Sequence, residues 1–397
     1  MKRNLSKTLA IVMALALVMS FAAVTAFAID GTATNTFQKY LVVGEDNAVL
    51  PDVTFTFTVT APESLAVAGT ADTLEIVPGP ISTDPAAPTV SSAAFTSTSS
   101  LQAGLPTDAD HTNPTSGSQY ASQDVTVDFS GVTFPAPGVY RYMITENATT
   151  AKGVTNDQNA VRYLDVVVIK DTTDVDEDGD TEELRIDSYV MRDQAENIDR
   201  NGDYVADPTA PGAKISSYTN TYETVDLEFS KKITGNQGDK NKQFKFTLAI
   251  TDANPGQYKV ELSRADVLKD DSNVAANEGV YTITVADDGT CTAYFYMADG
   301  DTVKVLDLPV GYGYTLTEDA EDYQAADGVD NDGTDNDYLD ATTGTAVDAD
   351  KKTGFTNTRE GIIPTGVIIT VAPFVIGILV FGAIILYMVS KRRRAEY

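Results

Sequence analysis

Three polar residue types that seldom share an apolar core recur in the same order in the two halves of this 397-residue chain. They are a lysine near the start of each half, a glutamate late in it and an asparagine close to its end: Lys39, Glu146 and Asn220, then Lys231, Glu318 and Asn357. Each lysine follows a phenylalanine by two positions. Residues two apart in a β-strand point to the same face. If the phenylalanines face a core, the lysines face it too.

An apolar core disfavours the charged form of both ionisable groups, so it lowers the pKa of a lysine and raises that of a glutamate. A neutral ε-amine is a nucleophile, and a protonated glutamate can hydrogen-bond the asparagine amide and move protons. The amine can then attack the amide carbon and expel ammonia. The predicted product is a Lys–Asn isopeptide crosslink, formed once in each half.

Each residue taken alone has an ordinary explanation. A lysine beside a strand can extend its ammonium group to water, and an asparagine near the end of a domain can be a turn residue. The occurrence of all three residues in both halves favours crosslinks.

The strands around these residues repeat as well, which indicates two copies of one domain. The matched segments are Phe37–Lys39 with Phe229–Lys231, Phe55–Val59 with Phe244–Leu248, Tyr142–Glu146 with Tyr314–Glu318, and Tyr218–Thr221 with Phe355–Thr358. The predicted domains are residues 29–222 and 223–360. The first carries an insertion at 61–122, rich in Ala, Ser, Thr and Pro, that predicts loops and short strands.

Between its two ends the chain shows little helical periodicity but many short runs of alternating apolar and Thr or Tyr residues. Val53–Val59, Val125–Phe129, Tyr163–Ile169 and Phe244–Ile250 are examples. This pattern predicts an all-β protein made of two tandem immunoglobulin-like β-sandwiches.

Acidic stretches at 171–183, 199–207 and 327–340 fall between the predicted strands. The first has the spacing of a calcium loop, but Arg185 occupies the position where an EF-hand needs its bidentate glutamate. We therefore predict solvated hairpin loops with no metal and no cofactor, and calcium binding is the alternative.

The composition argues against an enzyme. The chain has one cysteine, Cys291, one histidine, His111, and no tryptophan. No intramolecular disulfide can form, and histidine-dependent catalytic or metal sites are improbable. We expect Cys291 to be a strand residue, and single-turnover self-crosslinking to be the chemistry of this chain.

The two ends carry targeting patterns. Residues 1–28 have a basic start, an apolar run and the small-residue exit Ala26-Phe27-Ala28, as in a secretory signal peptide. Residues 367–390 are apolar and long enough for a transmembrane helix, and the tail 391–397 begins with four cations that favour the cytoplasmic side. The chain is thus predicted to be exported and held at the cell surface.

Between the second domain and the apolar segment lies a short motif, 361–366, that contains Pro364, Thr365 and Gly366. The order of Pro-Thr-Gly, apolar helix and basic stop resembles the sorting signal read by sortases of Gram-positive bacteria. The usual signal has a residue between Pro and Thr, which is missing here. The alternative is a simple single-span membrane protein.

The region between the terminal signals is strongly acidic. Of 28 cationic and 58 acidic side chains, seven cations and one acid lie in those signals, which leaves 21 against 57 and a net charge of −36. Such a surface repels nucleic acid, so no nucleic-acid partner is expected.

With these features together, the chain resembles the isopeptide-forming domains of Gram-positive backbone pilins, the streptococcal FctA-type family. The resemblance implies that Lys39 pairs with Asn220 under Glu146. In the second domain, it implies that Lys231 pairs with Asn357 under Glu318. It also implies a structural backbone pilin, polymerised by a sortase with identical subunits and anchored to peptidoglycan in the cell wall.

Sortase chemistry would cut after Thr365 and join it to a lysine of the next subunit. Lys214, six positions before Asn220, matches the region where related pilins offer their linking lysine. No Tyr-Pro-Lys motif is present, and an ordinary exposed lysine is the alternative. The competing function is an accessory pilin or a cell-wall adhesin that binds a host receptor.

Overall fold

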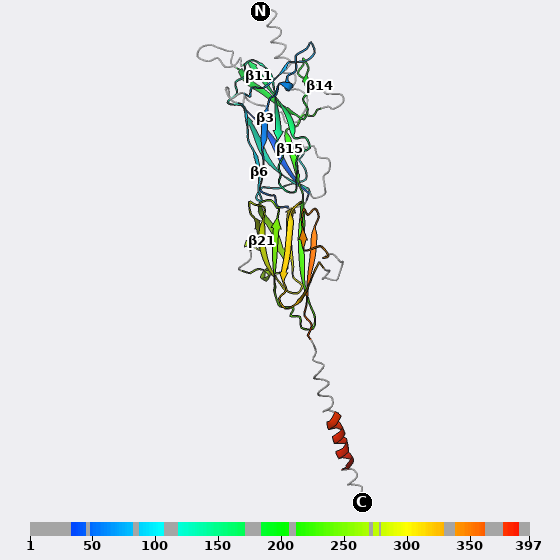
Figure 1. Cartoon of the computed structure of the whole chain (residues 1–397). Coiled ribbons are helices and arrows are strands. Elements are labelled where there is room, and N and C mark those ends of the chain that lie inside the picture. The colour runs from blue at the N-terminus through cyan, green and yellow to red at the C-terminus, as the bar shows by residue number, and fades with distance from the viewer. Residues whose placement is uncertain are drawn as a thin grey trace, which may run out of the picture.

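The computed structural model describes residues 33–44, 48–81, 87–106, 118–170, 184–205, 212–269, 273–277, 279–328, 338–361 and 376–388. The described chain folds into two β-rich domains stacked end to end in an elongated molecule (Figure 1). The prediction of an all-β protein is confirmed. Two single-turn 3-10 helices, η2 (Glu63–Leu65) and η3 (Ala265–Val267), interrupt the strands.

Two facing sheets build the first domain. One has the order β10 (Val154–Thr155), β15 (Ser217–Tyr222), β1 (Thr34–Val43), β8 (Gln119–Asp128) and β5 (Thr89–Val90), with β7 (Gln102–Ala103) also paired to β8. The other has the order β12 (Leu184–Arg192), β11 (Val161–Lys170), β9 (Gly138–Glu146) and β3 (Phe57–Thr60), with β4 (Ile76–Pro78) also paired to β9. Two small pairs complete it: β2 (Val53–Phe55) with β6 (Ala93–Phe95), and β13 (Asn197–Ile198) with β14 (Tyr204–Val205).

The second domain repeats this plan with fewer additions. Its larger sheet has the order β19 (Val274–Asn277), β20 (Val280–Val285), β18 (Gly256–Leu262), β22 (Thr302–Pro309), β16 (Thr224–Thr234), β26 (Lys351–Thr358) and β24 (Gln324–Asp327). The smaller sheet has the order β21 (Cys291–Met297), β17 (Phe244–Thr251), β23 (Gly313–Asp319) and β25 (Thr343–Gly344).

The first and last strands of each domain are parallel neighbours, β1 with β15 and β16 with β26. Lys39 stands opposite Tyr218 and Leu41 opposite Asn220. The second domain has the same offset, because the residue two positions after its lysine stands opposite its asparagine. A bond between lysine and asparagine would therefore join two adjacent strands that enter and leave the domain.

Each domain has its own aromatic core. In the first, Phe37 contacts Phe57 edge-on and Tyr218 at a tilt, with ring centroids 5.2 and 5.3 Å apart. In the second, Phe246 contacts Phe355 edge-on at 5.0 Å. Such aromatic pairs add to the stabilisation that comes from burial. The phenylalanines that precede the two lysines are both buried, as the strand alternation predicts.

Residue 223 alone separates β15 from β16, and hydrogen bonds cross between the domains. Asn254 of the second domain accepts from the backbone N–H of Lys152 at 2.8 Å and donates to its carbonyl at 2.7 Å. The N–H of Asp52 donates to the carbonyl of Pro255. These reciprocal bonds restrain the relative orientation of the domains.

The segment 61–122 contributes short strands and part of a long one. Phe95 of β6 is buried and its ring lies 5.8 Å from that of Phe55. The last four residues of the segment, 119–122, begin β8, so the predicted insertion runs into a strand of the shared sheet. The predicted continuous strand Val53–Val59 is interrupted at Thr56, where the chain passes from β2 to β3 and changes partner.

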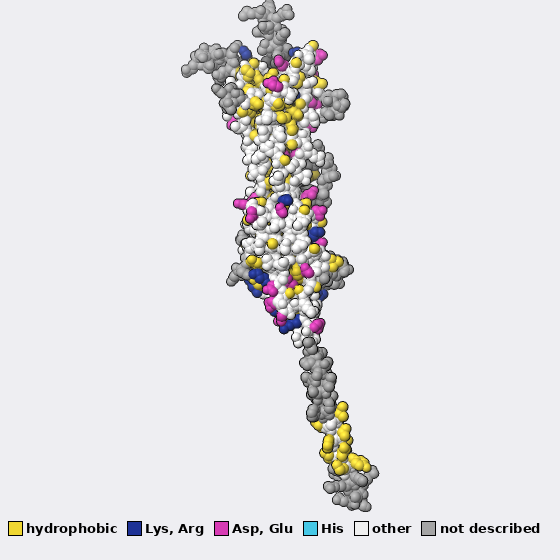
Figure 2. All heavy atoms as spheres, viewed as in Figure 1, with side chains coloured by type: hydrophobic (Ala, Val, Ile, Leu, Met, Phe, Trp, Pro, Cys, Tyr) yellow, Lys and Arg dark blue, Asp and Glu magenta, His cyan; other side chains and the backbone are white. Residues whose placement is uncertain are grey.

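The signal peptide, residues 362–366 of the sorting motif and the basic tail lie outside the described residues, as do His111 and the whole of the first acidic stretch, 171–183. Residues 376–388 form a helix with exposed apolar side chains (Figure 2). Among the described residues, no helix is both long and apolar enough to cross a membrane.

Candidate crosslinking sites

The first site lies between the two sheets of the first domain. Lys39 on β1 and Asn220 on β15 extend from one sheet, and Glu146 reaches them from β9 of the other. The Lys39 Nζ lies 2.7 Å from Glu146 Oε1, and Asn220 Nδ2 donates to the same oxygen at 3.1 Å. All three residues are buried, the lysine and asparagine completely.

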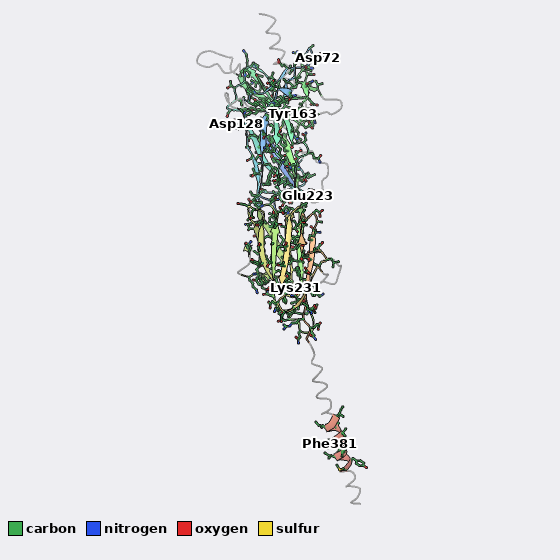
Figure 3. The ribbon with its side chains drawn as sticks, viewed as in Figure 1. Asp72, Asp128, Tyr163, Glu223, Lys231 and Phe381 are labelled. Carbon is green, nitrogen blue, oxygen red and sulfur yellow. The ribbon has the colours of Figure 1, made fainter. Side chains whose placement is uncertain are left out.

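The second site has the same construction. Lys231 on β16 and Asn357 on β26 share a sheet, while Glu318 extends from β23 of the opposite sheet. The Lys231 Nζ lies 2.6 Å from Glu318 Oε1, and Asn357 Nδ2 donates to that oxygen at 2.8 Å. Lys231 lies in the half of its domain away from the junction marked by Glu223 (Figure 3). The structure therefore brings together both sets of residues that the sequence analysis grouped.

Aromatic rings pack against both lysine side chains, which are buried from water. The Nζ of Lys39 lies 4.5 Å from the centroid of Phe55, and that of Lys231 lies 4.7 Å from the centroid of Phe244. Burial lowers the pKa of each lysine to about 8, although the neighbouring glutamate acts in the opposite direction. Deprotonation to the neutral amine is thus far easier for these lysines than for an exposed lysine.

Burial also raises the pKa of both glutamates above the ordinary range, against the opposing influence of the lysines. One oxygen of each carboxyl group, Glu146 Oε2 and Glu318 Oε2, is buried without a hydrogen-bond partner among the described residues. An ionised carboxylate with an unpaired oxygen is costly in such surroundings. The geometry favours one proton shared between amine and carboxyl.

This arrangement suits amide transfer. One glutamate oxygen contacts both the attacking amine and the amide nitrogen that must leave. It can accept a proton from the amine and deliver it to the departing nitrogen. Burial excludes the water that would compete with the amine and holds the reactants at short range.

Sequence reasoning missed two polar residues beside the first site. Asp157 and Arg162 form an ion pair at 3.0 Å, and the Asp157 backbone N–H donates to the side-chain oxygen of Asn220. The signal in the sequence was the run Asn156–Asn159, whose Asn and Asp residues favour side-chain-to-backbone turns, but such runs are common in ordinary loops.

A second buried ion pair was also missed. Arg141 and Asp165 are each about 1% exposed and form a two-pronged contact at 2.6 and 2.8 Å. Arg141 also donates to the carbonyl of Glu196, and Tyr204 donates to Asp165. This network attaches the hairpin of β13 and β14 to the sheet.

The structure also describes two other residues from the sequence analysis, Lys214 and Cys291. Lys214 is exposed, and its backbone forms an isolated bridge with Arg192 at the edge of β12. Cys291 is buried at the start of β21, and burial raises the pKa of its thiol. Pro364, Thr365 and Gly366 lie outside the described residues.

Comparison with known families divides the chain at the same junction. Residues 35–223 match the family described as the Spy0128-like isopeptide containing domain, and residues 225–359 match a family described as a domain of unknown function. The first of these matches spans the first domain. The second Lys–Glu–Asn set thus lies in a family whose description mentions no crosslink.

Individual relatives point the same way. A protein named "Pilin" from Streptococcus pyogenes serotype M1 is 28% identical over 276 residues, which cover 67% of this chain and 71% of that protein. The "Pilus tip adhesin Cpa" of Streptococcus pyogenes is 31% identical over 143 residues, which cover 35% of this chain and 18% of the adhesin. With the domain match, these similarities relate the chain to pilus proteins of Gram-positive bacteria.

Among solved structures, the major pilin protein T3.2 from Streptococcus pyogenes serotype GAS13637 aligns with a TM-score of 0.49 at 20% identity. The alignment covers 84% of this chain and 99% of that one.

Proposed function

We propose that this chain is the structural backbone (major) subunit of a covalently polymerised pilus, in which each domain closes its own Lys–Asn isopeptide bond. Lys39 bonds to Asn220 with Glu146 as the proton carrier, and Lys231 bonds to Asn357 with Glu318. The observation that carries the proposal is the shared construction of two separate sites, with one glutamate oxygen between an amine and an amide in each.

The proposed mechanical role follows from the strand order. Each bond would join the first strand of a domain to its parallel neighbour, the last strand. A pulling force that enters at one end and leaves at the other would then pass through covalent bonds and bypass most of the sandwich. This is a useful property for a fibre and a dispensable one for an isolated enzyme.

The proposal includes the finer assignments from the sequence. Residues 29–222 and 223–360 form two immunoglobulin-like sandwiches, preceded by the signal peptide 1–28. Residues 361–366 are the sortase motif, 367–390 the temporary membrane anchor and 391–397 the cytoplasmic tail. The exported chain would be joined by a sortase to identical subunits, with peptidoglycan as the final acceptor.

Lys214 is the proposed acceptor between subunits. Its side chain is exposed, while the chain around it is fixed: Gly212 donates to Glu196 at 2.7 Å, and Ile215 donates to the carbonyl of Met191. A fixed backbone with a free amine presents a nucleophile to an acyl-enzyme at little entropic cost. The competing function, an accessory pilin or adhesin, would need no such acceptor.

The test is co-expression of the full chain with a pilus-type sortase in a Gram-positive host that lacks pili. Wall extracts should contain a detergent-resistant ladder of covalent multimers. Lys214→Ala should reduce the ladder to monomer, whereas Lys170→Ala, at another exposed lysine of the first domain, should leave it unchanged. A single anchored species from the unaltered chain would instead support the adhesin, and a ladder from Lys214→Ala would move the linkage to another lysine.

A further inference from the structure

The two crosslinking sites differ at one atom, the carbonyl oxygen of the asparagine side chain. In the first site, Asn220 Oδ1 accepts a hydrogen bond of 2.8 Å from the backbone N–H of Asp157. In the second site, Asn357 Oδ1 is buried and has no hydrogen-bond partner among the described residues. This oxygen is the atom on which negative charge would develop when the amine attacks.

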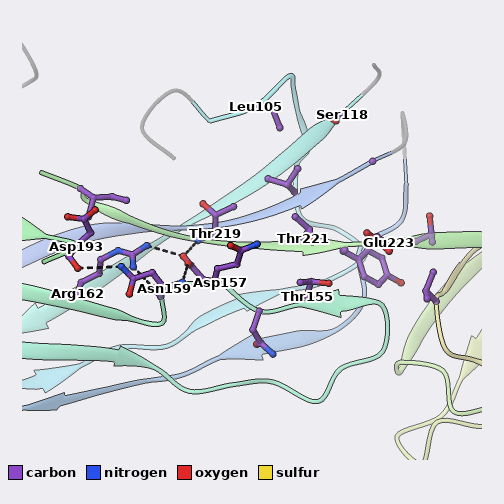
Figure 4. Close-up of a pocket in the computed structure, with 18 of the residues that line it drawn as sticks. Leu105, Ser118, Thr155, Asp157, Asn159, Arg162, Asp193, Thr219, Thr221 and Glu223 are labelled. Carbon is purple, nitrogen blue, oxygen red and sulfur yellow. Dashed lines mark hydrogen bonds and ion pairs between the residues drawn. The ribbon is translucent and has the colours of Figure 1, made fainter. Parts of the chain in front are cut away.

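The N–H of Asp157 is held in place by the side chain of the same residue. Its carboxylate accepts from the backbone N–H of Thr219 at 2.8 Å, from Arg162 Nη2 at 3.0 Å and from the N–H of Asn159 at 2.9 Å (Figure 4). Arg162 in turn donates to the carbonyl of Ser217. The loop is therefore tied to β15 at Ser217 and Thr219, just before Asn220.

The topology explains why the second site lacks this donor. In the first domain, β10 pairs with β15 over two residues, at Tyr222 and Thr221, and the chain then leaves the sheet as the loop that contains Asp157. In the second domain, β24 continues as a regular strand beside β26, with Ala325 opposite Asn357. The backbone N–H groups of a regular strand point to neighbouring strands, not to a side chain that faces the core.

We propose that the backbone N–H of Asp157 is an oxyanion donor for the first crosslink, and that this crosslink forms faster than the second. This rests on the proposed function, since both bonds must form. The lone pair of Lys39 Nζ attacks Asn220 Cγ, a C–N bond forms, and the carbonyl π electrons move to Oδ1, where the Asp157 N–H stabilises them. The carbonyl then re-forms, the Cγ–Nδ2 bond breaks, and Glu146 carries the amine proton to the leaving nitrogen, which departs as ammonia.

The charge of Asp157 cannot supply this advantage. Its carboxylate acts to raise the pKa of Lys39, which keeps the amine protonated, and Arg162 acts to lower it. These two influences oppose each other, and Glu146 has a larger effect than either. What distinguishes the first site is the directed N–H. Loss of one such donor in other enzymes slows the reaction by about 10²–10³ fold.

The test follows each crosslink separately in newly made full-length chains. Cell-free synthesis is stopped at intervals with acid and guanidinium, the chains are digested, and the two crosslinked peptide pairs are quantified by mass spectrometry. We expect Lys39–Asn220 to form at least ~10-fold faster than Lys231–Asn357, in line with the effect of one oxyanion donor. Equal rates, or a faster second bond, would overturn the inference.

Two changes at residue 157 isolate its N–H. Replacing Asp157 with its α-hydroxy acid counterpart, malic acid, turns the N–H into an ester oxygen and keeps the carboxylate. It should slow the first bond at least ~10-fold and leave the second unchanged. Asp157→Asn keeps the N–H but loses one of the two side-chain oxygens that hold it, so it should slow the first bond less than the ester does and leave the second unchanged.

The second bond in the same molecule reports whether the second domain has folded. An unchanged first bond in the ester variant would refute the role of the N–H. If neither bond formed in the unaltered chain, the proposed function itself would fail, a result that differs from two bonds formed at equal rates.

Discussion

The replacement Lys231→Met should reveal how much the second crosslink stabilises its domain. Methionine is close to lysine in length, has no amine and suits the aromatic pocket beside Phe244. Lys231 and Asn357 lie 126 positions apart in the chain. Closing a loop of that size restricts the unfolded chain by about 5 kcal/mol in the entropic model used for disulfides. For a domain of this size, that loss corresponds to a fall in Tm of about 15–20 °C.

The measurement is thermal unfolding of residues 29–361, with intact mass as the readout of the bond. The matched control is Lys232→Met, at the neighbouring lysine that is partly exposed. The control should keep the Tm of the second domain and its ammonia loss of about 17 Da. Lys231→Met should show no ammonia loss in the second domain and a lower Tm of that domain. A Lys231→Met protein that lacks the bond but unfolds at the same temperature as the control would refute the reasoning about stability.

Three other predictions concern pH, the buried ion pair and the domain junction. Crosslinking should be fastest while each lysine–glutamate pair holds one proton. The rate should fall in acid, where the amine is an ammonium. It should fall again as pH rises through about 8 and the pair loses its last proton, which quench-flow mass spectrometry can follow. A crosslinking rate that keeps rising above pH 8 would exclude a protonated glutamate. Arg141→Met should destabilise the first domain by about 3–5 kcal/mol in denaturant unfolding, because Asp165 is left as a buried unpaired charge, and the double change with Asp165→Leu should recover most of the loss. Gly153→Ala should lower the free energy of unfolding by about 2 kcal/mol or more, since φ is +71° and the new Cβ would lie 2.5 Å from the Glu223 carbonyl oxygen. The control Gly104→Ala, at φ +88° with open space around it, should lower it less. Calorimetry measures both changes.

Local patterns in the sequence predict much of the fold. Alternation of apolar and polar residues locates parts of β8, β11 and β17, because side chains in a strand alternate between the core and the other face. The same alternation places the two lysines on the core face. The repeat then relates the second set of residues to the first.

What the sequence does not reveal depends on contacts between distant segments. The run Val53–Val59 looks like one strand, yet the backbone carbonyl of Thr56 accepts from the N–H of Asn147, and the chain changes sheets there. The N–H of Asp157 gains its role because β10 is short and the next turn folds over Asn220. Neither arrangement has a periodic signature.

The intact mass of the exported region tests the central claim most directly. Residues 29–361, purified under denaturing conditions, should weigh about 34 Da less than the sequence requires, because each isopeptide bond releases one ammonia. The protein is then digested for peptide mapping. The missing mass should map to the peptide pairs Lys39 with Asn220 and Lys231 with Asn357. A mass equal to that of the sequence would show that the buried amines and amides lie side by side without reacting, and would contradict the account.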